Sequence, residues 1–354
     1  MKLTRSEFQN YIHSYEQDEI FYRDLYFVEK EHPETFMEYC QSLDREMITQ
    51  RKLYVPALRK EGWLPYLNEG TLFQDFTGDI MLSKHYRYTP AFAHEHEFFE
   101  IMCIYDGTVK TTIQGIPHTL QQGDVCIIPP HTRHSVSIFD DSIAINILVR
   151  TSAFQSTFFQ TLTADSALSQ FFTHVLYHKT EGNFLIFHTG NDKIVMKSVE
   201  KLFIEYLGHE KYSYTFLNSM LILFWAKLLR YHENDIESIL TKETTGSSMT
   251  EILNYLNQNY QIASLSDTAA HFGYSASHFS KLIKEGTGRT FLQIIRDIKL
   301  NQACRALRET TLSIPAICKL VGYETTEHFM RTFKKAYGMT PGEYRKTSSS
   351  LLEK

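Results

Sequence analysis

The stretch Ile314-Pro-Ala-Ile-Cys-Lys-Leu-Val-Gly-Tyr323, followed by His328-Phe-Met-Arg-Thr-Phe-Lys-Lys-Ala-Tyr-Gly338, decides the fold of the C-terminal part of this chain. Its first half predicts a short helix over residues 314–320, because Pro315 suits the first turn of a helix. A Gly-Tyr turn and a second helix follow. Helix, glycine turn and helix are the pattern of a helix-turn-helix unit.

The same pattern occurs once more, 50 residues earlier. His278-Phe-Ser-Lys-Leu-Ile-Lys-Glu-Gly-Thr-Gly288 aligns with residues 328–338, and both segments follow a Gly-Tyr pair. A short helix is predicted before the earlier pair, at 265–272, and a long helix at 291–308 joins the two units. The repeat predicts an all-α domain with two helix-turn-helix units over residues 249–346.

The second helix of the first unit has two different faces. Phe279, Leu282 and Ile283 recur at helical spacing and are expected to face the core. The opposite face carries hydroxyls and cations, which suit base edges and phosphates: Ser277, Ser280, Lys281 and Lys284.

The second helix of the second unit repeats this division. Phe329, Phe333 and Tyr337 form its apolar stripe, and the opposite face carries Glu327, Arg331, Lys334 and Lys335. A charged face is also common on helices that only meet water. DNA binding is favoured here because both copies place a cation at the same two aligned positions (Lys281 with Arg331, Lys284 with Lys334).

Residues 249–346 resemble the DNA-binding domain of the AraC/XylS family of bacterial transcription regulators. The resemblance implies that the long helix joins the two units rigidly and that they enter successive major grooves of double-stranded promoter DNA. It implies base-facing roles for Ser277, Ser280, Lys281, Thr326, Glu327 and Arg331. Ser277 is smaller than the side chain that some relatives present there, so the second unit is expected to read bases more strongly.

Length and composition set limits on the whole chain. Its 354 residues exceed one ordinary domain, and 43% hydrophobic with 22% charged residues is typical of a globular protein. The five cysteines form no CxxC pair. The N-terminus lacks a secretory signal pattern. The most apolar stretch, residues 216–229, is too short to cross a membrane. We expect a cytoplasmic protein that does not bind membranes.

Charge is distributed unevenly. Residues 249–354 carry 14 lysines and arginines against 9 acidic residues, whereas the rest carries 22 against 32. This asymmetry suggests that the C-terminal end meets a polyanion, although a difference of this size also arises by chance.

Four further segments precede the repeat. Residues 1–60 have helical spacing, and residues 61–150 have short apolar runs separated by turn residues, which is typical of a β-sandwich or barrel. Residues 151–240 return to helical spacing, and the small polar run at 241–248 reads as a linker. The expected fold is therefore multidomain: an N-terminal helical segment, a β-barrel with helices after it, and the C-terminal double helix-turn-helix domain.

An apolar seam runs along one of the helices after the barrel. Its members are Leu217, Leu221, Phe224 and Leu228, with Phe216, Met220 and Leu223 beside them. Helices in this place can simply pack on the barrel. The two apolar rows could also form a homodimer interface, and we expect residues 151–240 to dimerise.

The barrel region resembles the two motifs of cupins. His94, His96 and Glu100 have the same parity along a strand, and His134 follows the Pro129-Pro130 turn. These side chains suit a divalent transition metal or a polar effector. Two positions depart from the cupin pattern: His131 replaces the glycine after the prolines, and no asparagine lies four residues after His134.

The expected function is sequence-specific transcription regulation without enzymatic activity. By family analogy we expect an activator that contacts RNA polymerase and responds to a sugar-like effector held by His94, His96, Glu100 and His134. Two alternatives remain: a metal-dependent cupin enzyme fused to a DNA-binding domain, and a regulator whose barrel is only a dimerisation scaffold.

Overall fold

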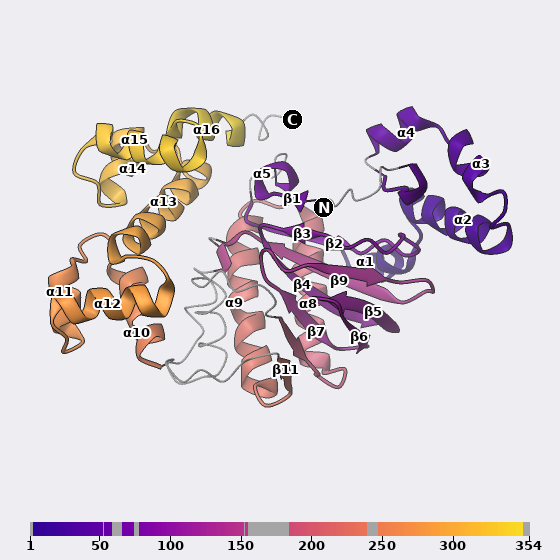
Figure 1. Cartoon of the computed structure of the whole chain (residues 1–354), viewed down its shortest axis with the longest axis horizontal. Coiled ribbons are helices and arrows are strands. Elements are labelled where there is room, and N and C mark those ends of the chain that lie inside the picture. Colours follow the sequence, from indigo (N-terminus) through magenta and orange to yellow (C-terminus); the bar gives the residue numbers. More distant parts are fainter. Residues whose placement is uncertain are drawn as a thin grey trace. The chain divides into compact units, whose positions relative to one another are not determined.

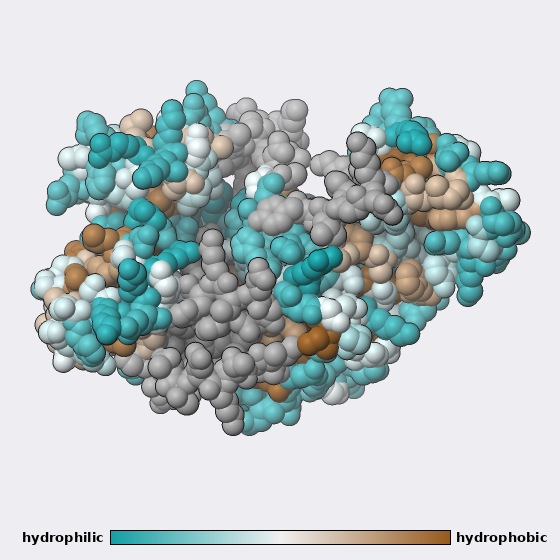
Figure 2. All heavy atoms as spheres, in the orientation of Figure 1, coloured by the Kyte–Doolittle hydropathy of each residue, from teal (hydrophilic) through white to brown (hydrophobic). Residues whose placement is uncertain are grey.

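The computed structural model of the chain (Figure 1; Figure 2) describes residues 3–51, 53–58, 66–73, 78–151, 153–154, 184–238 and 247–349. The chain divides into two compact units. The first comprises residues 1–69, 80–151 and 181–239, and the second comprises residues 70–79, 152–180 and 240–354. Within the described ranges, no helix is long and apolar enough to cross a membrane.

The first unit begins with helices, as its sequence predicts. These are α1 (Arg5–His13), α2 (Gln17–Glu31), α3 (Phe36–Ser42), α4 (Arg45–Gln50) and the 3-10 turn η1 (Pro56–Leu58). Local signals set their starts: Thr4 and Glu7 form a capping box at α1, and the Asp44 side chain accepts from two backbone N–H groups of α4. Buried Tyr22 and Cys40 belong to a common core.

The strands of the first unit form two main sheets. The larger sheet has the antiparallel order β11-β10-β7-β4-β9-β2, and the smaller has the order β6-β5-β8. The bounds are β2 (Ile80–Lys84), β4 (Phe99–Asp106), β5 (Thr108–Ile113), β6 (Ile116–Gln121), β7 (Val125–Ile128), β8 (His134–Ser137), β9 (Ile143–Val149), β10 (Leu185–Phe187) and β11 (Ile236–Ser238). A short parallel pair joins β1 (Tyr66–Leu67) to β3 (Glu95–His96), and α5 (Glu69–Leu72) follows β1.

Side chains from both sheets fill the space between them. Met102 and Ile128 of the larger sheet share one buried cluster with Ile113 and Val136 of the smaller sheet. The β-sandwich or barrel expected for residues 61–150 is therefore confirmed. Strands β10 and β11 extend the larger sheet from residues beyond 150, where only helices were expected.

Helices α8 (Lys193–Gly208) and α9 (Ser213–His232) pack against each other and against β2. Because these partners cover one side of α9, the expected dimer seam lies inside the unit: Leu217, Leu221, Phe224 and Leu228 are at most 4% exposed. The neighbouring row remains open, with Phe216 56% and Leu223 58% exposed. The seam is thus part of the core of the first unit, and the neighbouring row is the apolar row of α9 that stays exposed.

The C-terminal region folds into the expected all-α domain. Its helices are α10 (Ser247–Asn259), α11 (Leu265–His271), α12 (Ala276–Thr287), α13 (Phe291–Glu309), α14 (Ile314–Leu320), α15 (Thr326–Tyr337) and α16 (Pro341–Ser349). Helices α11–α12 and α14–α15 are the two helix-turn-helix units, and α13 connects them. Most of the expected linker at 241–248 lies outside the described residues.

The turn between α14 and α15 requires glycine. Gly322 has a φ of +76°, and a Cβ there would lie 2.8 Å from the carbonyl oxygen of Gln261. The carbonyl of Gly322 accepts a hydrogen bond of 2.6 Å from Lys299 Nζ of α13. This contact ties the second unit to the connecting helix.

Candidate functional site

Helix α12 presents the face that the sequence predicts. Phe279 and Ile283 are fully buried, which directs the opposite side of the helix to the surface. On that side Ser277, Lys281 and Lys284 are exposed and Ser280 is half-buried. Lys281 Nζ lies 3.7 Å from Glu285 Oε1, a weak pair because both side chains are well exposed.

Helix α15 repeats the arrangement. Phe329 and Phe333 are fully buried under the helix. The outer face carries exposed Glu327, Arg331, Lys334 and Lys335 and half-buried Thr326. Within the described part of the chain, Arg331 has no hydrogen-bond or ion-pair partner in the protein, so its guanidinium is available to a base edge or a phosphate.

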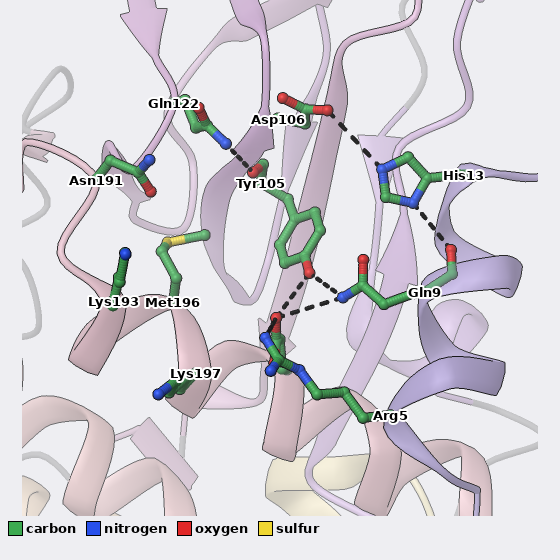
Figure 3. A pocket seen from close by; sticks show the side chains of 11 residues that line it. Arg5, Gln9, His13, Tyr105, Asp106, Gln122, Asn191, Lys193, Met196 and Lys197 are labelled. Atoms are coloured by element: carbon green, nitrogen blue, oxygen red, sulfur yellow. Dashed lines mark hydrogen bonds and ion pairs between the residues drawn. The ribbon is translucent and has the colours of Figure 1, made fainter.

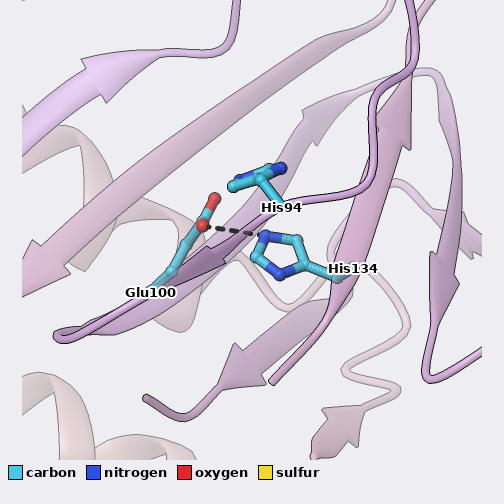
Figure 4. A group of neighbouring side chains, drawn as sticks. All are labelled: His94, Glu100 and His134. Atoms are coloured by element: carbon cyan, nitrogen blue, oxygen red, sulfur yellow. Dashed lines mark ion pairs between the residues drawn. The ribbon is translucent and has the colours of Figure 1, made fainter. Parts of the chain in front are cut away.

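A buried polar cluster lies in the barrel (Figure 4). His94 precedes β3, Glu100 lies on β4 and His134 begins β8, and the ligand atoms of all three lie within 4.8 Å of one another. The backbones of His94 and His134 form a bridge, with N–H donors at 2.9 and 3.1 Å from the opposing carbonyls. This bridge brings together residues that are 40 positions apart in the chain.

His96, the fourth predicted member, lies at the edge of the cluster. Its ring stacks on Phe98 at 4.4 Å, and its Nε2 lies 3.2 Å from Glu100 Oε2. The equal-parity prediction treated residues 94–100 as one strand, but the chain bends at residues 97–98, between β3 and β4. His96 therefore contacts Glu100 without belonging to the group of three.

Ionisation in the cluster follows from burial and from the close imidazoles. Burial lowers the pKa of His94 to about 3, and burial likewise lowers the pKa of His96. Burial alone would raise the pKa of Glu100, but His134 and His96 beside it hold that pKa well below its usual range. His94 and His96 are thus neutral near pH 7, and Glu100 is a carboxylate.

In the neutral tautomers of His94 and His134, ring-nitrogen lone pairs lie near the Glu100 carboxylate. The Nδ1 atoms of His94 and His134 lie 3.2 and 2.9 Å from the carbonyls of Phe92 and Thr132, which can only accept hydrogen bonds. In the neutral form, Nδ1–H therefore donates and Nε2 carries the lone pair. His134 Nε2 is buried without a hydrogen bond and lies 3.3 Å from Glu100 Oε2, which is also an acceptor. With His134 neutral in this tautomer, a cation or a hydrogen-bond donor between the two atoms would satisfy both.

The sequence reading missed Asn146. Strand β9 pairs Asn146 with Met102 and Leu148 with Glu100, so Asn146 shares the interior face of Glu100. Its Oδ1 is buried and has no hydrogen-bond partner. Asn146 is the one polar residue in the apolar run Ile-Ala-Ile-Asn-Ile-Leu-Val of β9, and that signal could have identified it.

Two family models match the chain. "AraC-like ligand binding domain" covers residues 81–181, which include strands β3 to β9 and the histidine–glutamate cluster. "Helix-turn-helix domain" covers residues 268–347, which include α12 and α15. Together they cover about half of the chain.

Curated relatives match this chain over most of their own length. The chain is 26% identical over 266 residues to the HTH-type transcriptional activator RhaS of Klebsiella pneumoniae, covering 73% of this chain and 89% of that protein. It is 24% identical over 262 residues to RhaS of Escherichia coli O9:H4, with the same coverage.

Among solved structures, ToxT of Vibrio cholerae O395 matches with 14% identity, 77% coverage of this chain, 98% coverage of that chain and a TM-score of 0.33. A TM-score this low does not support a family assignment. The assignment of a family rests on the two family models and on the geometry of α12, α15 and the barrel. The chain therefore belongs to the AraC family: it is a DNA-binding transcription regulator with a ligand-binding barrel domain ahead of two helix-turn-helix units.

Proposed function

We propose that this regulator activates transcription in the cytoplasm when a sugar-like molecule binds inside its barrel, and that it acts as a homodimer that contacts RNA polymerase. The relatives named above are transcriptional activators, which supports the direction of regulation. The double helix-turn-helix domain supplies the contact with promoter DNA. We assign no catalytic step to the barrel, because these relatives are regulators.

The buried acceptors of the barrel carry the proposal of a polar effector. The Glu100 carboxylate, the Nε2 of His134 and the Oδ1 of Asn146 share one interior, and the latter two have no hydrogen-bond donor among the residues that the structure describes. Buried polar atoms without partners cost free energy unless something satisfies them. A polyol brings several O–H donors on a compact frame, which is what this set of acceptors requires.

A divalent transition metal is the second candidate occupant. The unpartnered Nε2 of His134 and the ionised Glu100 fit such an ion, and His94 completes a three-ligand set. The hydrogen bonds from each Nδ1 to a backbone carbonyl would orient the two imidazoles as metal ligands. A bound ion would polarise an oxygen atom of the effector.

DNA recognition follows from the two exposed helix faces. Helices α12 and α15 would enter adjacent major grooves, about 10 bp apart. Ser277, Ser280, Lys281, Thr326, Glu327 and Arg331 are proposed to face bases. Lys284, Lys334 and Lys335 would hold the phosphate backbone.

Dimerisation is assigned to the open row of α9. Phe216 and Leu223 are more than half exposed, and Met220 lies between them at helical spacing. Large apolar side chains in a row on one helix are typical of a surface that another copy covers.

A promoter reporter with a panel of sugars tests the effector proposal. Glu100→Gln and His134→Ala should abolish the response to the active sugar while leaving basal DNA binding unchanged. His32→Ala, which removes an exposed histidine outside the barrel, is the matched control. Elemental analysis of untagged protein measures the metal: near-stoichiometric content that His134→Ala removes would identify the second occupant.

The opposite results separate the alternatives. No metal, no stabilising sugar and an unaltered promoter response in both barrel variants would leave the barrel as a dimerisation scaffold. A bound metal together with turnover of a candidate substrate would favour the enzyme alternative.

A further inference from the structure

A pocket on the first unit lies apart from the histidine–glutamate cluster (Figure 3). Its volume is about 520 Å³. Helix α1 forms one wall and the start of α8 forms the other, with Tyr105 of β4 between them. None of the members of the histidine–glutamate cluster lines it.

A closed hydrogen-bond network forms one part of this pocket. The Glu200 carboxylate accepts from Arg5 at 2.9 and 3.1 Å and from the Tyr105 hydroxyl at 2.8 Å. Burial raises the pKa of Tyr105 to about 12, so this hydroxyl keeps its proton and remains a donor. Arg5 and Glu200 therefore neutralise each other, and the network offers no net charge to a ligand.

The opposite wall carries positive charge that the protein does not balance. Lys193 and Lys197 lie one helical turn apart on α8 and line the same pocket. In the described ranges neither lysine has a hydrogen-bond or ion-pair partner, and neither has the neighbouring Asn191 side chain. Asp106, the other acidic residue of the lining, has its Oδ2 3.8 Å from Nε2 of the adjacent His13.

We propose that this pocket binds a phosphate monoester of a sugar or a similar polyol. Two adjacent lysines match a dianion, and a phosphate monoester carries close to two negative charges at pH 7. A bare phosphate ion would leave most of the volume empty. The remaining lining includes the side chains of Gln9 and Gln122, whose amide nitrogens donate within the protein. Their Oε1 atoms can accept from hydroxyl groups of a ligand, which an apolar ligand lacks.

The position of the pocket gives binding a structural consequence. Arg5, Gln9 and His13 come from one face of α1, and the lysines come from α8, so a ligand held by both would tie the N-terminal helix to the helices after the barrel. The phosphate site would thus act on the same unit as the barrel effector, but through different residues.

Thermal unfolding of the full chain, followed by tryptophan fluorescence, tests the proposal with glucose 6-phosphate and ribose 5-phosphate as probes. At least one ester should raise the midpoint in a saturable way. The double variant Lys193→Ala/Lys197→Ala should weaken its Kd by about tenfold or more, since each lysine supplies a charge-assisted contact. Lys201→Ala is the matched control, because it removes an exposed lysine of α8 that does not line the pocket.

Three results would overturn the proposal. The first is no saturable shift with either ester. The second is an equal loss of affinity in Lys201→Ala, which would reduce the effect to general charge. The third is binding that survives the double variant but is lost in Glu100→Gln, which would place the ester in the barrel. Loss of the ester-induced shift in the double variant, with the shift retained in Glu100→Gln, supports the pocket independently of the proposed function.

Discussion

Glu19→Ala should destabilise the first unit strongly, because it leaves two buried cations without their anion. Glu19 of α2 is fully buried, and its carboxylate accepts from Arg87 Nε at 2.8 Å and from Lys84 Nζ at 2.5 Å. The Lys84 and Arg87 side chains are 1% and 2% exposed. Both cations also donate to the carbonyl of Ser14, which only partly compensates them.

The expected loss in the free energy of unfolding follows from the desolvation of the two cations. Removing one partner of a buried ion pair costs about 3–5 kcal/mol, because the remaining charge cannot reach water. A loss of about 4 kcal/mol is a large share of the 5–15 kcal/mol typical of a folded domain. The triple variant Glu19→Leu/Lys84→Met/Arg87→Met should recover most of it, since it removes the charges together.

Urea unfolding of the full chain, followed by tryptophan fluorescence, measures this loss. Trp225 is fully buried in the first unit, so its emission reports the unfolding of that unit. Glu29→Ala, at an exposed position of α2, is the control and should change stability by less than about 0.5 kcal/mol. A loss below about 1 kcal/mol in Glu19→Ala would refute the reasoning.

The pH dependence gives an independent check. Burial alone would raise the pKa of Glu19, but hydrogen bonds from Arg87 and Lys84 lower it below the usual 4.5. Glu19 therefore contributes stability above the unfolded pKa, and that contribution is lost as the pH falls through the folded pKa. The difference between wild type and Glu19→Ala should shrink as the pH drops below about 4.5.

Three further predictions concern DNA binding, assembly and pH. Arg331→Ala should cost about 1–3 kcal/mol of binding free energy on the specific DNA site and relax the base preference at one position. Lys334→Ala should weaken binding to all sequences alike and reduce the salt dependence of the affinity. Quantitative footprinting separates the two effects, and an equal loss of affinity for specific and random DNA in Arg331→Ala would contradict the base contact. Leu223→Glu should convert a dimer to a monomer in sedimentation at micromolar concentration, and a wild type that is already monomeric would remove the assignment. Burial alone would lower the pKa of His188, but Glu237 and Asp124 raise it. The ion pairs of His188 therefore stabilise the fold below about pH 6.5, and this stabilisation is lost as the pH rises through the folded pKa. The melting midpoint should fall over that pH range in wild type and fall less in His188→Ala.

The helices of the DNA-binding domain could be predicted because their signals are local. Helix α14 occupies residues 314–320 as expected, since Ser313 caps its first turn and Pro315 fits that turn. The buried stripe of α15 follows from the 3–4 spacing of Phe329 and Phe333. Family resemblance gave the roles of the exposed residues, which spacing alone does not distinguish from a solvated face.

The sequence by itself determined the order of the segments, the double helix-turn-helix repeat and three members of the barrel cluster. Only the tertiary structure decided which apolar row of α9 is buried, because both rows have the same spacing and the choice depends on α8 and β2 packing on one side. It also decided that His96 contacts Glu100 at 3.2 Å but stands outside the three residues whose ligand atoms all lie within 4.8 Å of one another. The lysine pocket joins α1 to α8 across more than 180 residues, and Glu19 meets Arg87 across 68. Contacts at such separations depend on how the chain packs, and no spacing within a single segment encodes them.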